Sequence, residues 1–204
     1  MTARMYGVVC CTAVVVAFGS AAYAQTPNVP GRLAVSGTIG VLRPLDRSMT
    51  DVYGSRLMPF SAQVDVRLNV DVSVFGGLKW VRAGGHTVIV GTPVAEESYE
   101  TSLRTASYRF GAQVSRWVAR RWALAGGAGV CITAYEETWP DAGLAVSNRV
   151  TGFIALAEGR YALNARWNAI ARVEYSTIPE KTTVQNAGVN LGGLDASAGV
   201  RFIF

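Results

Sequence analysis

The stretch 60-FSAQVDVRLNVDVSV-74 decides the fold of this chain. From Phe60 to Val74 every second residue is apolar, and most of the residues between them are polar or charged. A period of two places alternate side chains on opposite faces of an extended chain. The run is too long for one ordinary strand, and Asn69–Asp71 has the composition of a turn. The stretch therefore predicts two antiparallel strands joined by a tight turn.

The same alternation recurs along most of the chain and ends at Phe204. Together with 22 glycines and many β-branched residues it disfavours helix. We expect about eight strands, at 32–43, 60–69, 71–83, 102–115, 121–135, 149–161, 166–177 and 191–204. Long connections are expected at 44–59, 84–101, 136–148 and 178–190, and short ones near 69–71, 116–120 and 162–165. Long loops at one rim and tight turns at the other are typical of transmembrane β-barrels.

The first 24 residues have the pattern of a secretory signal peptide. Arg4 supplies the positive start, residues 8–18 form an apolar run, and Ala22-Tyr23-Ala24 matches the small-x-small cleavage pattern. The apolar run is shorter than the roughly 20 residues that a spanning helix needs. We therefore divide the chain into a cleaved signal peptide, 1–24, and a single β-barrel domain, 25–204.

The composition favours an outer surface that does not face water. Only 16% of the 204 residues are charged, and Lys79 and Lys181 are the only lysines. A soluble domain has roughly 25% charged residues. The basic residues are scattered, whereas nucleic-acid binding requires a basic cluster, so we expect no nucleic-acid partner.

Alternation alone does not say whether the apolar face points outward to lipid or inward to a core, because a soluble barrel has the same period. The composition of the polar face indicates that the apolar face points outward to lipid. The polar face is rich in small residues, and its few charges occur as neighbours of opposite sign. In a narrow lumen such charges have to be paired. The predicted lumen ion-pair network comprises Asp65, Arg67, Glu158, Arg160, Arg172, Glu174, Asp195 and Arg201. Glu158, Arg160, Arg172 and Glu174 fall on consecutive expected strands, so we expect cross-strand pairs among these four.

Aromatic residues gather near the ends of the expected strands, which is where a membrane barrel meets the two bilayer interfaces. The predicted aromatic belts comprise Trp80, Trp117, Trp122, Tyr135, Trp167 and Tyr175.

The final residues, 198-AGVRFIF-204, resemble the C-terminal strand of bacterial outer-membrane barrels. The size and rhythm of the mature chain resemble the OmpA/OmpX-type eight-stranded family. The resemblance implies an all-β, up-and-down antiparallel barrel in the cell outer membrane, surrounded by lipid and lipopolysaccharide. It also implies that Val200, Phe202 and Phe204 form the signal read by the barrel-assembly machinery. We expect a monomer.

His86 is the only histidine and falls in an expected long loop with Glu96, Glu97, Ser98 and Ser102. Some small outer-membrane barrels modify lipopolysaccharide with a histidine and a serine or acidic partner, but a solvated loop histidine is the simpler interpretation. A metal site needs more ligands than one histidine and one distant cysteine. We therefore expect no enzyme activity, no metal and no cofactor.

The sequence favours a structural or surface-interaction protein that presents its long loops outside the cell and has a plugged lumen. Three alternatives remain open: a narrow channel for small solutes, a lipid A-modifying enzyme that uses His86, and a soluble periplasmic carrier.

Overall fold

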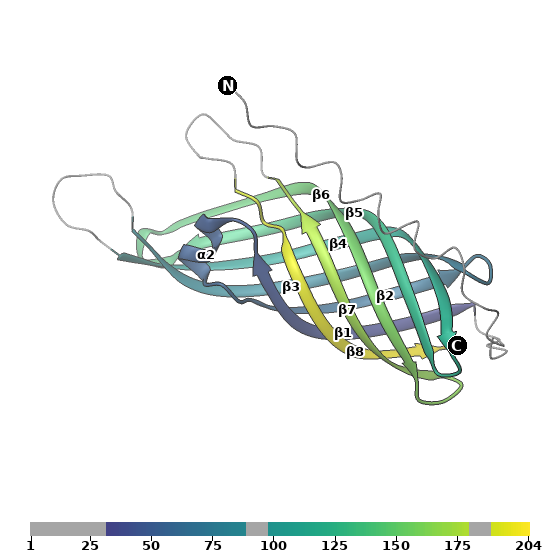
Figure 1. Cartoon of the computed structure of the whole chain (residues 1–204). Coiled ribbons are helices and arrows are strands. Elements are labelled where there is room, and N and C mark those ends of the chain that lie inside the picture. Colours follow the sequence, from purple (N-terminus) through teal and green to yellow (C-terminus); the bar gives the residue numbers. More distant parts are fainter. Residues whose placement is uncertain (1–31, 89–97, 180–188) are drawn as a thin grey trace, which may run out of the picture.

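The computed structural model describes residues 32–88, 98–179 and 189–204, which form a closed antiparallel barrel of eight strands in sequential order. Figure 1 shows the tilted strands wrapping around the barrel, with one short helix at the end opposite the C-terminus. The predicted signal peptide lies outside the described residues. The strands are β1 (Leu33–Pro44), β2 (Met58–Arg67), β3 (Val72–Val88), β4 (Ser98–Ala119), β5 (Trp122–Trp139), β6 (Leu144–Ala162), β7 (Trp167–Thr177) and β8 (Gly193–Ile203).

Pairing of β1 with β8 closes the barrel, with Val35 opposite Phe202 in the register. Short turns join β2 to β3, β4 to β5 and β6 to β7 at the end where β1 begins and β8 finishes; we call this the turn end and the opposite one the loop end. Two of the turns use the same device. The side-chain oxygen of Asn69 accepts hydrogen bonds from the backbone N–H groups of Asp71 and Val72, and Asn164 does the same after β6. An Asx turn of this kind replaces the ladder where the strand ends.

The predicted strands are found in the expected order, but strands extend into two of the long connections. The ladder between β3 and β4 continues to Val88 opposite Ser98, and that between β5 and β6 to Trp139 opposite Leu144. The loops expected at 84–101 and 136–148 are therefore shorter than the sequence suggested. The reason is that the outward residues of these extensions are polar, so the ladder continues after the apolar alternation that marked the strands has ended.

The connection expected at 44–59 contains a helix, α2 (Arg47–Tyr53), which the sequence analysis did not predict. Asp46 caps its start by accepting a hydrogen bond from the Ser48 N–H at 2.8 Å. Gly54 ends it with a positive φ of 87°, a conformation that glycine adopts without strain. Within the described residues no helix has the length and apolarity that crossing a membrane requires.

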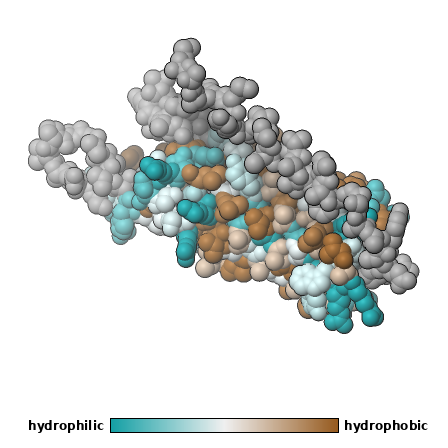
Figure 2. All heavy atoms as spheres, in the orientation of Figure 1, coloured by the Kyte–Doolittle hydropathy of each residue, from teal (hydrophilic) through white to brown (hydrophobic). Residues whose placement is uncertain are grey.

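The alternation resolves into an apolar outer wall and a polar lumen. Val64 and Val200 on the wall are 42% and 49% exposed, whereas Asp65 and Arg201 beside them in sequence are 2% and 6% exposed. Figure 2 shows brown apolar side chains across the middle of the wall and teal polar ones toward its ends. A soluble barrel has the opposite arrangement, so the prediction of an apolar exterior is confirmed.

Candidate functional site

The lumen is the candidate site because most of the buried charge of the described chain lies in it. Glu158 on β6 forms ion pairs with Arg160 at 2.6 Å and with Arg172 on β7 at 2.5 Å. Glu174 on β7 pairs with Arg109 at 2.5 Å and with Lys79 at 3.0 Å. Each carboxylate thus lies between two cations, as a buried charge requires.

Two further carboxylates extend this network. Lys79 also reaches Asp195 at 2.8 Å, so the β3 lysine bridges β7 and β8. Asp65 lies 3.3 Å from Arg201 and accepts hydrogen bonds from Gln63 and Gln113 at 2.8 and 2.9 Å. The side chains therefore cross the lumen and tie together strands that are not neighbours in the sheet.

The structure pairs the predicted network residues partly as expected from the sequence. Glu158 pairs with its sequence neighbour Arg160 and, as part of the cross-strand network expected between β6 and β7, with Arg172. Arg201 pairs with Asp65 on β2 and not with Asp195. Residues two apart on a strand share a face, yet in a narrow barrel the opposite wall is equally close. Arg67 lies half-buried at the turn end.

Two residues of the network, Lys79 on β3 and Arg109 on β4, were not predicted from the sequence; both bind Glu174. Both side chains are buried. Alternation could have predicted that both point inward. Lys79 is on the same face of β3 as Ser73 and Phe75, and Arg109 is on the same face of β4 as Ser107 and Gln113. What the sequence lacked was an acidic neighbour on the same strand.

Apolar side chains fill the rest of the lumen. One cluster lies among the charged side chains, with Cys131 opposite Arg109 and Leu156 opposite Glu174 in the register, and consists of Phe75, Cys131, Ile154, Leu156 and Ile178. The other brings two residues of α2 into the mouth of the barrel and consists of Leu42, Met49, Tyr53, Leu57, Val81, Leu103 and Tyr135. A cavity of about 20 Å³ lies between the charged and apolar layers, which is room for about one water molecule.

Helix α2 is held in the mouth by polar contacts as well. The Tyr53 hydroxyl donates to the Glu137 carboxylate and lies 3.1 Å from the Thr101 hydroxyl. Burial, helped by the adjacent carboxylate, raises the pKa of Tyr53, so the phenol stays protonated. On the other side, Asp46 accepts a hydrogen bond from the Asn190 N–H at 3.0 Å, and this bond is the main reason that the pKa of Asp46 lies below its usual value.

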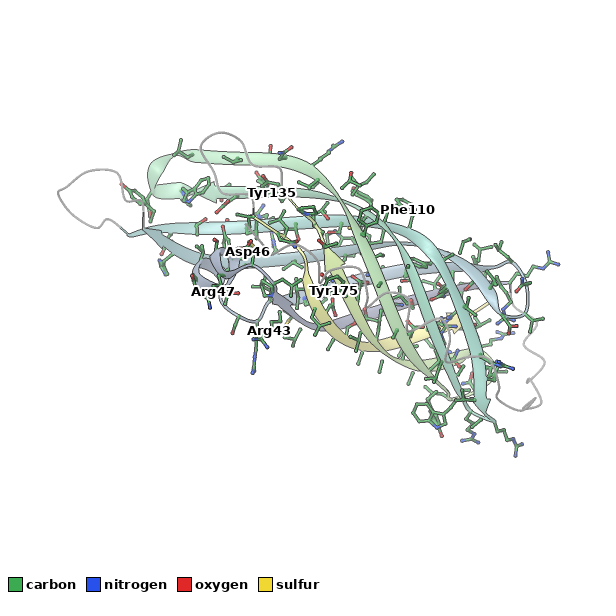
Figure 3. All side chains as sticks on the ribbon, turned by 45° about the horizontal axis from the view of Figure 1, so that its top comes forward. Arg43, Asp46, Arg47, Phe110, Tyr135 and Tyr175 are labelled. Carbon is green, nitrogen blue, oxygen red and sulfur yellow. The ribbon has the colours of Figure 1, made fainter. Side chains whose placement is uncertain are left out.

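A ring of exposed charged residues, mostly arginines, limits the apolar wall toward the loop end; we call it the collar. Going toward the loop end, the first charged residues on the outward column are Arg43, Arg82, Arg104, Glu136 and Arg149, on β1, β3, β4, β5 and β6. All five are exposed, and Figure 3 shows Arg43 pointing away from the barrel. Arg82 is opposite Arg104, and Arg104 is opposite Glu136. A groove of about 910 Å³ on this part of the wall is lined by Trp80 and by three arginines of the collar, Arg82, Arg104 and Arg149.

Of the predicted aromatic belt residues, Trp80, Trp122, Trp167 and Tyr175 are exposed on the outer wall. Trp122 packs on Tyr161 with ring centroids 5.0 Å apart, and Trp167 packs on Phe202 at 4.9 Å. Trp117 is half-buried and is opposite the buried Ala123.

The prediction for Tyr135 was wrong. Its side chain is buried in the cluster under α2, because Tyr135 belongs to the same inward column of β5 as Cys131 and Thr133. Its closeness to the rim suggested an interfacial role, but alternation determines which way it points.

Only part of the alternative histidine site lies within the described residues. His86 is exposed on β3 and is opposite Glu100 in the register. The Ser102 hydroxyl bonds instead to the Thr138 hydroxyl at 2.8 Å. Glu96 and Glu97 lie outside the described residues, as does the side chain of Ser98. Within the described part of the chain no three His, Cys, Asp or Glu residues are grouped as a metal site.

The three predicted assembly-signal residues lie on or beside β8. Val200 faces outward and Phe204 is exposed. Phe202 is half-buried between Trp167 and Phe204, whose ring centroids lie 4.9 and 4.8 Å from its own.

Comparison with known proteins identifies the fold. No protein-family model matches the chain, and no significant match was found among curated proteins. Among solved structures, Neisserial surface protein A is similar over 84% of this chain and 97% of its own, with 17% identity and a TM-score of 0.62. The outer membrane protein OprG from Pseudomonas aeruginosa is similar over 85% of this chain and 96% of its own, with 11% identity and a TM-score of 0.62. The chain therefore has the fold of a small outer-membrane barrel, as predicted.

Proposed function

We propose that this outer-membrane β-barrel is a closed anchor that presents the extended strands of the β3–β4 and β5–β6 pairs to partners outside the cell. The observation that carries the proposal is the double closure of the lumen. Ion pairs cross the middle of the lumen, and an apolar plug capped by α2 fills the loop end.

A channel would need a continuous path of water past both layers. Opening the charged layer would separate buried ion pairs, and removing one partner of such a pair costs about 3–5 kcal/mol. Opening the other layer would expose the apolar cluster around Leu103 and Tyr135. Both costs favour a barrel that stays shut.

The hairpins above the collar suit a surface role because they are tied to each other. The Glu100 N–H donates to Asp141 at 3.3 Å, and Ser102 contacts Thr138. On β6, Leu144 and Val146 are 56% and 47% exposed. Apolar side chains on a polar, ordered hairpin are a suitable contact for a protein partner.

The collar suits contact with lipopolysaccharide. Its arginines lie directly above the apolar wall, at the level where phosphate groups of the outer leaflet are expected, and guanidinium groups bind phosphate well. Replacing Arg104 with Gln is expected to reduce the stabilisation of the folded barrel by added lipopolysaccharide, while Arg121→Gln at the turn end leaves it unchanged. Equal stabilisation of both variants would contradict this part of the proposal.

Planar-bilayer recording tests the closed lumen. The wild-type barrel is expected to give no stable conductance steps. A variant with Lys79, Arg109 and Glu174 all changed to Ala removes the charged layer around Glu174 and provides a loosened reference barrel, whose folding is checked by its faster gel migration. Stable open steps from the wild-type protein would refute the anchor and favour a channel.

We further propose that the protein has no catalytic role. His86 is exposed, and the Ser102 hydroxyl is engaged with Thr138. Cells that carry His86→Ala are expected to have the same lipid A composition as cells with the wild-type protein; an altered composition would restore the enzyme hypothesis.

For assembly, we propose that Phe204 is read by the barrel-assembly machinery and that the barrel inserts as a monomer. Deleting Phe204 is expected to lower the amount of folded protein in the outer membrane. Crosslinking of intact membranes is expected to give a single-chain band, and a dominant dimer band would contradict the monomer.

A further inference from the structure

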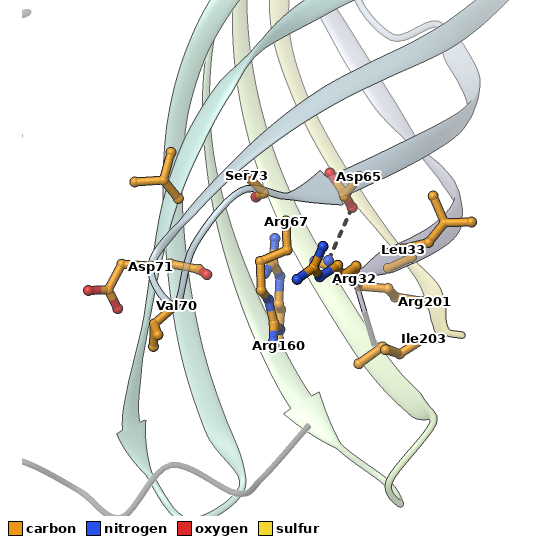
Figure 4. A pocket seen from close by; sticks show the side chains of 13 residues that line it. Arg32, Leu33, Asp65, Arg67, Val70, Asp71, Ser73, Arg160, Arg201 and Ile203 are labelled. Carbon is orange, nitrogen blue, oxygen red and sulfur yellow. Dashed lines mark ion pairs between the residues drawn. The ribbon is translucent and has the colours of Figure 1, made fainter. Parts of the chain in front are cut away.

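Four arginines surround a small cavity at the turn end of the lumen, on the side opposite α2 (Figure 4). Arg32 precedes β1, Arg67 ends β2, Arg160 lies on β6 and Arg201 on β8. Figure 4 shows their guanidinium groups converging between the strands. The anchor function proposed above does not depend on this cluster.

Two of these arginines are deeply buried and incompletely bonded. Arg160 and Arg201 are 7% and 6% exposed. Within the described residues, Nη2 of Arg160 and both Nε and Nη1 of Arg201 have no hydrogen-bond partner. Buried donors of charged groups are normally bonded, because leaving them unbonded costs free energy. In the same described part of the chain, Asp65 Oδ2 and the side-chain oxygens of Gln63 and Gln113 also lack a hydrogen-bond partner, so it is the charge of the cluster that indicates a missing anion.

The nearby carboxylates supply too little negative charge for the cluster. Asp65 is shared with Gln63 and Gln113 as well as Arg201. Glu158 is shared between Arg160 and Arg172, with Arg201 at 3.9 Å. Asp71, which also lines the cavity, lies on the exposed β2–β3 turn. Four guanidinium groups thus surround a cavity lined by two carboxylates.

We propose that the turn end of the lumen binds one small inorganic anion, of the size of chloride, between Arg67, Arg160 and Arg201. An anion accepts hydrogen bonds from all sides and supplies the missing negative charge, whereas a water molecule supplies no charge. The free volume is about 10 Å³, so the site holds no more than one small ion. The buried Ser73, which also lines the cavity, adds a hydroxyl donor.

The test compares unfolding temperatures in sodium chloride and sodium gluconate at equal sodium concentration, because gluconate is too large for the cavity. The wild-type midpoint is expected to rise with chloride and to saturate, by about 5 °C or more once chloride exceeds its dissociation constant a hundredfold. Arg67→Gln removes one wall of the site and leaves the ion pairs of Arg160 with Glu158 and of Arg201 with Asp65 in place. This variant is expected to lose the rise.

Arg121→Gln is the matched control, since Arg121 is exposed on a turn at the same end. It is expected to keep the wild-type response to chloride. An equal rise in the wild type and in Arg67→Gln would overturn the proposal, because a general salt effect would then explain it.

A second measurement does not depend on how the variants fold. Crystals of the wild-type protein grown in bromide are expected to show one anomalous peak between Arg160 and Arg201. If no peak appears there at a bromide concentration that saturates the thermal effect, the site is refuted.

Discussion

At the scale of single residues, Glu158 holds the charged layer together. It is 3% exposed and bonds both Arg160 and Arg172. Glu158→Gln would leave two buried guanidinium groups without their counter-charge, and we expect it to lower the free energy of unfolding by about 3–5 kcal/mol. Urea unfolding in lipid vesicles, followed by tryptophan fluorescence, measures this loss.

Glu136→Gln is the control for that measurement, because Glu136 is exposed on the outer wall of β5. A surface change of this kind is expected to alter stability by less than about 0.5 kcal/mol. Equal losses in the two variants would show that the buried pairs contribute no more than a surface charge.

Gly111 is the second residue whose size is fixed by its surroundings. A Cβ there would lie 2.4 Å from the Ala128 carbonyl oxygen and 2.6 Å from the ring of Phe75, which fills the lumen above it. Gly111→Ala is expected to destabilise the barrel by about 1–3 kcal/mol, since the backbone oxygen has nowhere to move. Gly37→Ala, where a Cβ meets nothing within 4 Å, should be nearly neutral in the same assay.

From the sequence, the direction of a lumen side chain could be predicted, but the ion-pair partners of Asp65 and Glu174 could not. The direction of each lumen residue followed from alternation, so Asp65 and Glu174 were placed correctly. Their partners did not follow, because Glu174 binds Lys79 and Arg109 from β3 and β4, and these contacts depend on how the barrel closes. Tyr135 was misassigned because its place near the rim was given more weight than its column.

At the scale of elements, α2 is the part that distinguishes this barrel from a bare cylinder of strands. It buries Met49 and Tyr53 in the loop-end mouth and is fixed by the Tyr53 hydroxyl. Tyr53→Phe keeps the ring but removes both polar contacts, and we expect a loss of about 1–3 kcal/mol. The matched control is Tyr108→Phe on the exposed wall of β4, which should be close to neutral.

Protease sensitivity of the connection between β1 and β2 gives a local readout of the same change. In Tyr53→Phe the chain near α2 is expected to be cut faster, with the rest of the barrel intact. An unchanged cutting rate would mean that the apolar contacts of Met49 alone hold the helix.

The strands could be predicted from the sequence because each side of the barrel wall has a uniform environment. The helix could not, because its seven residues contain only three with apolar side chains, Met49, Val52 and Tyr53, too short a run for a helical period to be recognised. The upper parts of β3 to β6 were missed for a related reason. Above the collar, the outward face of the β3–β4 hairpin carries polar residues such as His86 and Glu100, so strand pairing persists without an outward apolar column.

At the scale of the whole molecule, the barrel is inverted relative to a soluble one. Apolar side chains cover the outside between the arginine collar and the turn end, and the ionic network lies inside. This arrangement is stable only where lipid replaces water around the wall, since contiguous apolar surfaces of this extent are unfavourable in water. The low charge of the chain and its scarcity of lysine are consequences of the same requirement.

The direct test of this account is the contact between wall methyl groups and lipid chains, measured by intermolecular NOEs on the wild-type protein in nanodiscs. Val64 and Val200 are expected to give cross-peaks with acyl-chain protons, and the inward-facing Ile154 and Leu156 are expected to give none. Acyl-chain contacts at Ile154 and Leu156, with none at Val64 and Val200, would contradict the inside-out barrel.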